Sequence, residues 1–319
     1  MTNGLIDLKN KINEISEHVI DKKNCVYIDY PFHFNVGDLL IFKGTIEYFK
    51  SQNIRINAAY SVKNFSLKKL RKQVDHNTTI FLHGGGNFGD LYPIHQSLRE
   101  CIIKNFPDNR IILLPQSVYF ESEDILQKSR EIFSQHKNTV LFARDEISLQ
   151  TLQSFSSKTF LMPDMAHTLY GIINTNKSIS TKPTLYFFRQ DKEQDDQQKN
   201  YLAQHNLQSF DWEDFILPEH HSRQKMLRKV LKFGFIFSSK YIDNYVYEEW
   251  EKLTDELINN SINLFSSYKT VITSRLHGHI LSSILEIPST ILDNSYKKNS
   301  LYYASWTAQL GIHQLAAKN

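Results

Sequence analysis

The stretch Ser-Arg-Leu-His-Gly-His at residues 274–279 separates two apolar runs and carries three side chains that can bind anions or transfer protons. Arg275 has a planar guanidinium that pairs with a carboxylate or a phosphate through two parallel hydrogen bonds. His277 supplies an imidazole, a group that can act as an acid or a base near neutral pH. The stretch predicts an anion site with His277 as acid or base, and the alternative is a capped turn in the core.

The two histidines of this stretch are poorly spaced for a shared metal ion. His277 and His279 stand two residues apart, so their side chains diverge by about 200° in a helix and lie on opposite faces of a strand. No H-E-x-x-H pair or other helical ligand pair accompanies them. We therefore expect no metal site.

Polar and glycine-rich segments recur where predicted strands end. In open α/β sheets, ligands bind outside the carboxyl ends of the strands, beside helix N-termini. The segments are FHFNVGD (32–38), HGGGNFGD (83–90), PQS (115–117), ARDEIS (143–148), PDMAH (163–167) and FRQD (188–191). Their repetition predicts a ligand-binding cleft at these strand ends.

Several charged residues of these segments have a structural interpretation beside a functional one. Asp38 is of a type suited to a helix N-cap and equally to a ligand contact. Arg144 and Asp145 are expected to form a salt bridge and a helix cap, respectively. Asp164 suits either a helix cap or a base between two domains, and both interpretations stay open.

The glycine-rich segment matches G-x-G-x-x-G at Gly84, Gly86 and Gly89, but it does not predict a dinucleotide site. The match does not open the first βα unit, Pro93 follows closely, and the next strand ends in PQS without an acidic residue. A lipase oxyanion loop is excluded because the chain has no G-x-S-x-G. We expect a glycine turn whose backbone amides approach an anionic or sugar ligand.

The elements that would position these residues alternate in the manner of a parallel α/β sheet. Six strands are predicted at 25–30, 54–60, 78–83, 110–117, 139–144 and 158–164, with helices at 38–50, 67–74, 93–106, 123–136 and 146–155. A second set has strands at 184–190, 270–274 and 289–293 and helices at 247–266 and 278–285. A helix is also expected over the last segment, 301–317.

The polar, proline-terminated segment 174–183 predicts a linker between two domains. We expect a Rossmann-like N-terminal domain over residues 1–176 and a Rossmann-like C-terminal domain over 177–300. Residues 301–319 are expected to pack back on the first domain. The fold class is thus α/β, with two Rossmann-like domains facing a cleft.

Composition excludes several classes of protein. The chain has 319 residues, 41% hydrophobic and 22% charged, and no apolar run approaches the ~20 residues that span a bilayer. The net charge is only +3, and the chain has none of the blocks of basic residues interleaved with aromatics that nucleic-acid grooves require, so nucleic acid is not an expected partner. The apolar residues of the N-terminal segment follow the period of a helix and form no signal-peptide pattern, so a cytoplasmic location is expected.

The order of these motifs resembles the polysaccharide pyruvyltransferase family. The resemblance covers most of the chain and rests on NVGD (35–38), GGGN (84–87), PQS (115–117), ARDEIS (143–148), PDMAH (163–167), Arg189, SRLHG (274–278) and Tyr296-Lys297. It implies transfer of a pyruvyl group from phosphoenolpyruvate to a sugar diol, giving a cyclic ketal, in a two-domain architecture similar to GT-B glycosyltransferases. The chain departs from the family at 118–120, where Val-Tyr-Phe replaces Gly-Pro after the glutamine-serine pair.

The resemblance assigns roles residue by residue. Arg189, Arg275, His277 and Lys297 are expected to bind phosphoenolpyruvate, and His277 to act as general acid and base. Asp164 or Asp38 is expected to be the second proton carrier. The expected acceptor-binding residues are Asn35, Gly85, Gly86, Asn87 and Gln116. No cofactor is expected beyond phosphoenolpyruvate as donor substrate, and the acceptor is a saccharide.

Alternatives remain for both function and location. A GT-B glycosyltransferase using a nucleotide sugar would share the fold, and a non-catalytic glycan-binding protein would keep the loops. Residues 223–240 mix six basic with eight large apolar residues. They predict either a core helix and strand or a peripheral contact with the inner face of an anionic membrane that carries a lipid-linked acceptor.

Overall fold

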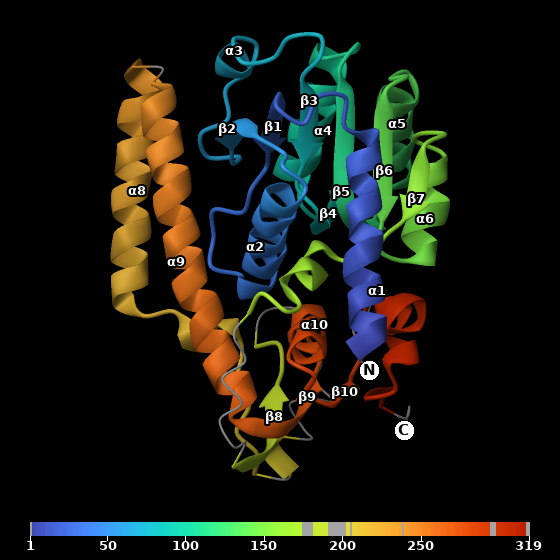
Figure 1. Ribbon diagram of the computed structural model, residues 1–319, viewed down its shortest axis with the longest axis vertical. Coiled ribbons are helices and arrows are strands. Elements are labelled where there is room, and N and C mark those ends of the chain that lie inside the picture. The colour runs from blue at the N-terminus through green and yellow to red at the C-terminus, as the bar shows by residue number, and fades with distance from the viewer. Residues whose placement is uncertain are drawn as a thin grey trace.

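The computed structural model describes residues 2–173, 181–190, 202–204, 206–237, 239–293 and 298–316, which form two parallel β-sheets placed end to end (Figure 1). The first sheet has the order β2-β1-β3-β5-β6-β7, with the short strand β4 paired to β5. Its strands are β1 (Cys25–Ile28), β2 (Ile56–Tyr60), β3 (Thr79–Leu82), β4 (Gly85–Gly89), β5 (Arg110–Tyr119), β6 (Thr139–Ala143) and β7 (Thr159–Leu161). The chain moves outward from β1 to β2 and then back across β1 to β3, so the direction of winding reverses between β1 and β3.

Helices cover both faces of the first sheet because its strands are apolar on both sides. Tyr27, Phe81 and Ile112 align across three strands and face α1, α2 and α9, while the following residue of each strand faces α4, α5 and α6. The helices of this half are α1 (Thr2–Ile12), η1 (Asn13–His18), α2 (Val36–Ser51), α3 (Leu67–Leu70), α4 (Pro93–Asn105), α5 (Glu123–Ser134), α6 (Glu146–Gln153) and η2 (Met165–Leu169).

The second sheet has four parallel strands in the order β11-β10-β9-β8. They are β8 (Lys182–Phe187), β9 (Tyr268–Thr273), β10 (Ser289–Ile291) and β11 (His313–Leu315). The helices of this half are η3 (Trp212–Phe215), α8 (Pro218–Phe237), α9 (Lys240–Ser266), α10 (Leu276–Ile284), α11 (Lys298–Tyr302), the π-helical turn η4 (Tyr303–Thr307) and η5 (Ala308–Leu310).

The antiparallel pair α8 and α9 lies along one side of the molecule (Figure 1), and α9 contacts both sheets, through β2 of the first and β9 of the second. Helix α9 packs on α2, and Trp250 donates its indole N–H to the carbonyl of Pro31 at 2.6 Å. A buried ion pair joins Lys69 to Asp243 at 2.9 Å. One apolar core therefore continues from the first half into the second.

The last segment differs from the helix expected over 301–317. Short helical turns give way at Gly311, whose φ of 70° ends the helical path, and β11 then adds an edge strand to the second sheet. The segment does contact the first half, because Tyr302 accepts a hydrogen bond from the Asp164 backbone at 3.0 Å and Trp306 donates to the carbonyl of Arg144 at 2.7 Å.

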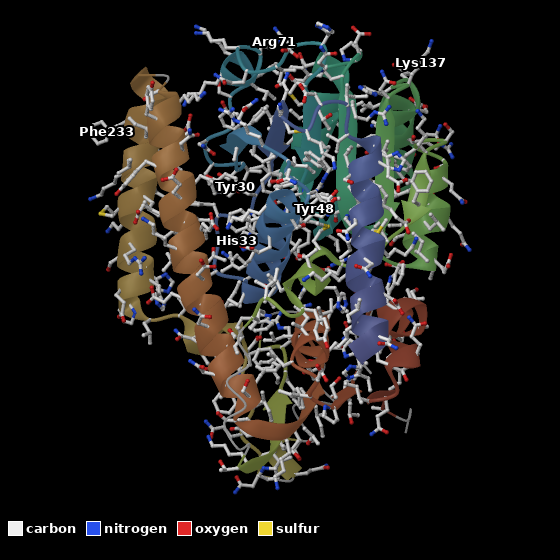
Figure 2. The ribbon with its side chains drawn as sticks, in the orientation of Figure 1. Tyr30, His33, Tyr48, Arg71, Lys137 and Phe233 are labelled. Atoms are coloured by element: carbon white, nitrogen blue, oxygen red, sulfur yellow. The ribbon has the colours of Figure 1, made fainter. Side chains whose placement is uncertain are left out.

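Two further expectations need correction. Strand β4 was not among the six predicted for the first sheet. Residues 223–240 form most of α8 and the start of α9, so the alternative of a helix followed by a strand is wrong. Phe233 projects outward from α8 with 61% of its surface exposed (Figure 2). None of the helices that the structure describes combines the length and the apolar character needed to span a membrane. The predicted linker lies mainly outside the described residues, over 174–180.

Candidate active site

A cavity of about 440 Å³ opens between the two halves, at the carboxyl ends of β1, β8 and β9. Its first-half wall includes His33, Asn35, Asp38, Gly86, Asn87 and His95. Its second-half wall includes Arg189, Arg275, His277 and Lys298. Most of the predicted site residues therefore meet in one place, although they come from distant parts of the chain.

Arg275 occupies the N-cap position of α10, directly beyond β9. The Thr273 hydroxyl accepts a hydrogen bond from the Arg275 backbone N–H at 3.0 Å and shapes the turn. The guanidinium donates through Nε and Nη2 to both carboxylate oxygens of Asp211, with an Nε–Oδ1 distance of 2.8 Å. Asp211 is buried and held by a capping box with Asp214. This pairing fixes the guanidinium at the cavity wall, and Asp211 was not predicted.

His277 lies in the first turn of α10 with 13% of its side chain exposed. Its Nε2 is 3.4 Å from Oδ2 of Asp164, an ion-pair distance without hydrogen-bond geometry to any described residue. On the other side of the ring lies Gly37, where an added Cβ would be 2.8 Å from Nδ1. A side chain at position 37 would therefore displace the imidazole.

Asp164 is fully buried and lies behind His277. Burial alone would raise the pKa of its carboxyl, but the guanidinium of Arg144 and the ring of His277 hold that pKa well below its ordinary value. The carboxylate also caps η2 by accepting from Ala166 N–H at 2.9 Å. Asp164 thus caps a helix, as one of the two interpretations predicts, and it also contacts His277. The predicted salt bridge of Arg144 is confirmed, with Asp164 as its partner.

The two histidines of the opening stretch diverge as expected. His279 is completely buried, and its ring nitrogens lie 2.9 Å from the Ser289 hydroxyl and 2.7 Å from the Thr307 hydroxyl. It faces the interior of the second half, whereas His277 faces the cavity. The two imidazoles therefore have separate surroundings.

The first turn of α2 presents a polar rim to the cavity. Asn35, and not Asp38, caps this helix, because its side-chain oxygen accepts from Gly37 N–H at 3.1 Å. Asp38 lies in the first turn of α2 and accepts from the Asn35 side-chain amide at 3.0 Å. The ring of His33 is 3.7 Å from the same carboxylate oxygen. The expectation of Asp38 as cap is wrong, but its place at the cavity wall is as predicted.

The glycine-rich segment forms β4 instead of a phosphate-binding turn at a helix. Gly85 has a φ of 120°, which other residues rarely adopt. Gly86 brings the backbone close to two cations, since an added Cβ would lie 3.3 Å from Nη2 of Arg144 and 3.9 Å from Nζ of Lys298. Asn87 lines the cavity, while the fully buried Gln116 donates to its side-chain oxygen at 3.2 Å from behind.

Of the cations predicted to bind phosphoenolpyruvate, Arg189 lines the cavity along with Arg275. Arg189 lies just beyond β8, and its backbone N–H donates to the Ser274 hydroxyl at 3.2 Å. Lys297 lies outside the described residues, and the adjacent Lys298 lines the cavity. Asp145 caps α6 as expected, accepting from Ser148 N–H at 2.8 Å.

Besides Asp211, the sequence analysis did not predict His95 and Asp29 as site residues. His95 lines the cavity from the first turn of α4, and Asp29 lies behind it at the end of β1. Neither stands in a recognised motif, and they are 66 residues apart. The one available signal was the position of Asp29 at a strand end.

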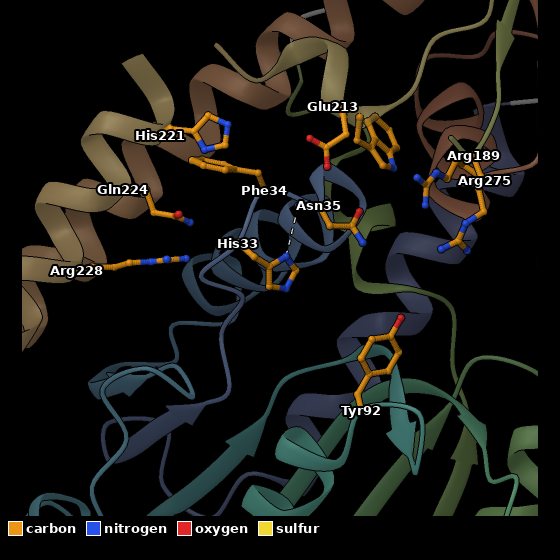
Figure 3. Close-up of a pocket in the computed structure, with 11 residues that line it drawn as sticks. His33, Phe34, Asn35, Tyr92, Arg189, Glu213, His221, Gln224, Arg228 and Arg275 are labelled. Carbon is orange, nitrogen blue, oxygen red and sulfur yellow. Dashed lines mark hydrogen bonds between the residues drawn. The ribbon is translucent and has the colours of Figure 1, made fainter. Parts of the chain in front are cut away.

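A second cavity, of about 690 Å³, adjoins the first and shares His33, Asn35, Arg189 and Arg275 with it. It extends toward α8, from which His221, Gln224 and Arg228 point toward the β1–α2 loop (Figure 3). The site therefore has room beyond the group that meets His277.

Comparisons with known proteins agree with this architecture. Residues 35–296 match the family model for polysaccharide pyruvyl transferase. The chain is 37% identical to EpsO of Bacillus subtilis (strain 168), a protein named as a pyruvyl transferase, over 95% of this chain and 91% of EpsO. It is 28% identical to pyruvyl transferase 1 of Schizosaccharomyces pombe, over 89% of this chain and 70% of that protein.

A crystal structure of an uncharacterized protein from Klebsiella pneumoniae has the same fold. The TM-score is 0.61 at 21% sequence identity, and the match covers 98% of this chain and 99% of the other. The extent of the family match and the identity to EpsO together show that this chain is a transferase and belongs to the polysaccharide pyruvyl transferase family.

Proposed function

We propose that this transferase takes the pyruvyl group from phosphoenolpyruvate and joins it to two hydroxyls of a saccharide as a cyclic ketal. The observation that carries the proposal is the meeting of Arg275, Arg189 and Lys298 with His277 on one wall of a single cavity. Phosphoenolpyruvate carries a carboxylate and a phosphate close together, and guanidinium groups match both. The opposite wall is polar and less cationic, as a sugar requires.

The proposed reaction balances without a redox step. The methylene carbon of phosphoenolpyruvate gains a proton, and a sugar oxygen loses its proton and bonds to the central carbon. The bond from that carbon to the phosphate oxygen then breaks, and a second hydroxyl closes the ring as it loses its proton. In the net reaction, the two hydroxyls lose two protons. One proton is gained by the methylene carbon, which becomes a methyl group, and the other is gained by the released phosphate. We propose no cofactor, because these side chains suffice for the steps.

We assign the proton for the methylene carbon to His277, which stands on the donor wall with the three cations. Asp164 keeps its charge at neutral pH because its pKa is held so low, so we propose it as the ion-pair partner of His277 and not as a proton carrier. The second carrier then belongs to the first-half wall, where Asp38 is the residue expected from the sequence.

The acceptor is proposed to lie against Asn35, Gly86 and Asn87, with Gly85 and Gln116 shaping that wall from behind. The adjoining cavity next to α8 offers space for further sugar residues (Figure 3). A saccharide of more than one residue would therefore contact both halves.

At larger scale we propose a GT-B-like arrangement with boundaries at 1–176, 177–300 and 301–319. Two separate parallel sheets with the candidate site between them support this arrangement.

We also propose a cytoplasmic location at the inner face of the membrane, with a lipid-linked acceptor. The basic residues of α8 beside the exposed Phe233 support this contact, which liposome flotation tests.

Calorimetric titration with phosphoenolpyruvate tests the donor assignment. We expect wild-type protein to bind, and Arg275→Ala or Arg189→Ala to weaken binding at least about tenfold, since each removes a charge-assisted contact. Arg71→Ala is the matched control, because Arg71 is exposed and pairs only with Asn105 among the described residues. Binding of a UDP-sugar without phosphoenolpyruvate would instead favour a glycosyltransferase.

A further inference from the structure

A second imidazole faces the cavity from the wall opposite His277. His95 stands in the first turn of α4, and 15% of its side chain is exposed. Its Nδ1 lies 2.8 and 2.9 Å from the two carboxylate oxygens of Asp29. An ionised carboxylate only accepts hydrogen bonds, so Nδ1 is the atom that donates. In the neutral ring Nε2 then carries the lone pair.

Asp29 is held in place more firmly than a surface carboxylate. It is buried at the end of β1 with a φ of 72°, a conformation that costs energy for a residue with a side chain. Its backbone N–H donates to the carbonyl of Tyr60 at 2.6 Å. Backbone strain of this kind gathers at functional sites, where the surrounding structure maintains it. Here the strained residue directs its carboxylate at His95.

Arg99 completes the support from one helical turn further along α4. Its guanidinium lies 3.4 Å from Asp29 and donates to the backbone carbonyl of Asn87 at 3.0 Å. His95 and Arg99 share a face of α4 because they are four residues apart. The same buried cation joins the carboxylate behind His95 to Asn87 at the cavity wall. The other titratable rings nearby are His83, His33 and Tyr92.

The Nε2 side of His95 is available to a ligand. Among residues 2–173 and the other described ranges, none forms a hydrogen bond with this atom. Asp38, the carrier expected from the sequence, already accepts from the Asn35 amide and adjoins His33. The geometry of a fixed imidazole backed by a buried carboxylate is the one that proton-abstracting histidines use.

We propose that His95 is the general base on the acceptor side, and that Asp29 is its positioning residue. This assignment rests on the proposed function. Nε2 takes the proton of the attacking sugar hydroxyl as its oxygen bonds to the central carbon of phosphoenolpyruvate. His277 gives a proton to the methylene carbon from the donor side. His95 then returns its proton to the departing phosphate and takes the proton of the second hydroxyl as the ring closes. His95 releases this proton to solvent, and His277 regains from solvent the proton that it gave to the methyl group.

The test uses glycan from cells that lack this chain as acceptor, and radiolabelled phosphoenolpyruvate as donor. We expect His95→Gln to lower kcat/KM for the glycan about 10²- to 10⁴-fold, the usual contribution of a general base. The acidic limb of its pH profile should vanish, while calorimetric affinity for phosphoenolpyruvate stays unchanged. Asp29→Asn should lower kcat/KM for the glycan without changing the affinity for phosphoenolpyruvate, because an amide can itself donate to Nδ1 and no longer requires the ring proton to stand there.

His76→Gln is the matched control, because His76 is exposed and lines neither cavity. Wild-type rates and pH profile in His95→Gln would overturn the assignment, as would loss of the acidic limb in Asp38→Asn alone. Loss of phosphoenolpyruvate affinity together with a lower unfolding midpoint in His95→Gln would show a structural role and overturn it too. Failure of wild-type protein to transfer any label would contradict the proposed donor itself, a result distinguishable from these.

Discussion

Arg275 and His277 owe their positions to partners that the sequence does not place beside them. Asp211 lies 64 residues from Arg275, and Asp164 lies over a hundred residues from His277. The residue types alone indicated anion binding and proton transfer. The contacts add that the guanidinium is fixed by a buried carboxylate and that the imidazole is confined between a carboxylate and the backbone of Gly37.

Gly37→Ala tests whether the His277 ring is confined, because it adds one methyl group next to that ring. The new Cβ would stand 2.8 Å from Nδ1, which is closer than such atoms approach, so the ring must shift. We expect kcat to fall about 10²-fold, the size of effect that a displacement near 1 Å produces. Alanine suits a helix better than glycine, so the unfolding midpoint should not fall much. Unchanged kcat in single-turnover measurements would show that the ring is not confined there.

Sequence analysis found the residues of this site that stand in short motifs and missed those that support them. Asn35, Asp38, Arg275 and His277 lie just beyond strand ends, where a parallel sheet places ligand contacts, and Asn87 lies in β4, which follows the end of β3. His95 lies within a helix, and its partner Asp29 adjoins it only once β1 and α4 are packed together. Such pairs depend on tertiary structure, and local patterns do not reveal them.

At the scale of elements, α10 presents polar side chains to the interior as well as to the cavity. His279 and Ser283 of this helix meet Ser289 and His313 in a buried network, with His313 nitrogens 2.9 Å from both hydroxyls. Burial lowers the pKa of His313 to about 4 and that of His279 well below its ordinary value. Burial also lowers the pKa of His167, in η2, to about 4, with Asp164 acting in the opposite direction and His277 adding to the fall.

These histidines predict a stability that depends on pH. The unfolded chain takes up protons on them near pH 6.5, whereas the folded chain does so only near pH 4 for His167 and His313. Stability is thus complete above pH 6.5 and is lost as pH falls toward 4, by an amount on the order of 1 to 3 kcal/mol for each. Urea unfolding at pH 7 and pH 5 should show this loss.

The stability that depends on the histidines begins to fall at a higher pH than the stability contributed by carboxylates with a depressed pKa. The contribution of Asp164 to stability, for example, declines only below pH 3.8, the ordinary pKa of its carboxyl. His313→Gln should reduce the difference between pH 7 and pH 5, and His76→Gln should leave it as it is. Equal urea midpoints at the two pH values in wild-type protein would contradict this prediction.

Most elements were predictable because their apolar residues follow the period of a helix or a buried strand. The strands β1, β3, β5 and β6 and the helices α2, α4 and α5 lie within a few residues of the predicted ranges. Strand β4 consists largely of glycine and has no apolar pattern, so only its pairing with β5 defines it. Strand β11 has three residues and likewise depends on its neighbour β10.

In the molecule as a whole, the two parallel sheets lie end to end (Figure 1). One cavity lies at the carboxyl ends of β1, β8 and β9. One wall is rich in cations and the other in amide, glycine and imidazole groups. The continuous apolar core and the length of α9 hold these walls at a fixed separation. This division suits a reaction between a small anionic donor and a neutral polyol.

The central claim is tested most directly by following the central carbon of phosphoenolpyruvate. Donor labelled with an isotope at that carbon is incubated with the protein and glycan from cells that lack this chain, and the product is analysed by NMR and mass spectrometry. The account predicts a quaternary ketal carbon that bears a methyl and a carboxylate and is bonded to two oxygens of one sugar, with one phosphate released per ketal. A label found in an ester or an enol ether, or glycan extended only by a nucleotide sugar, would contradict it.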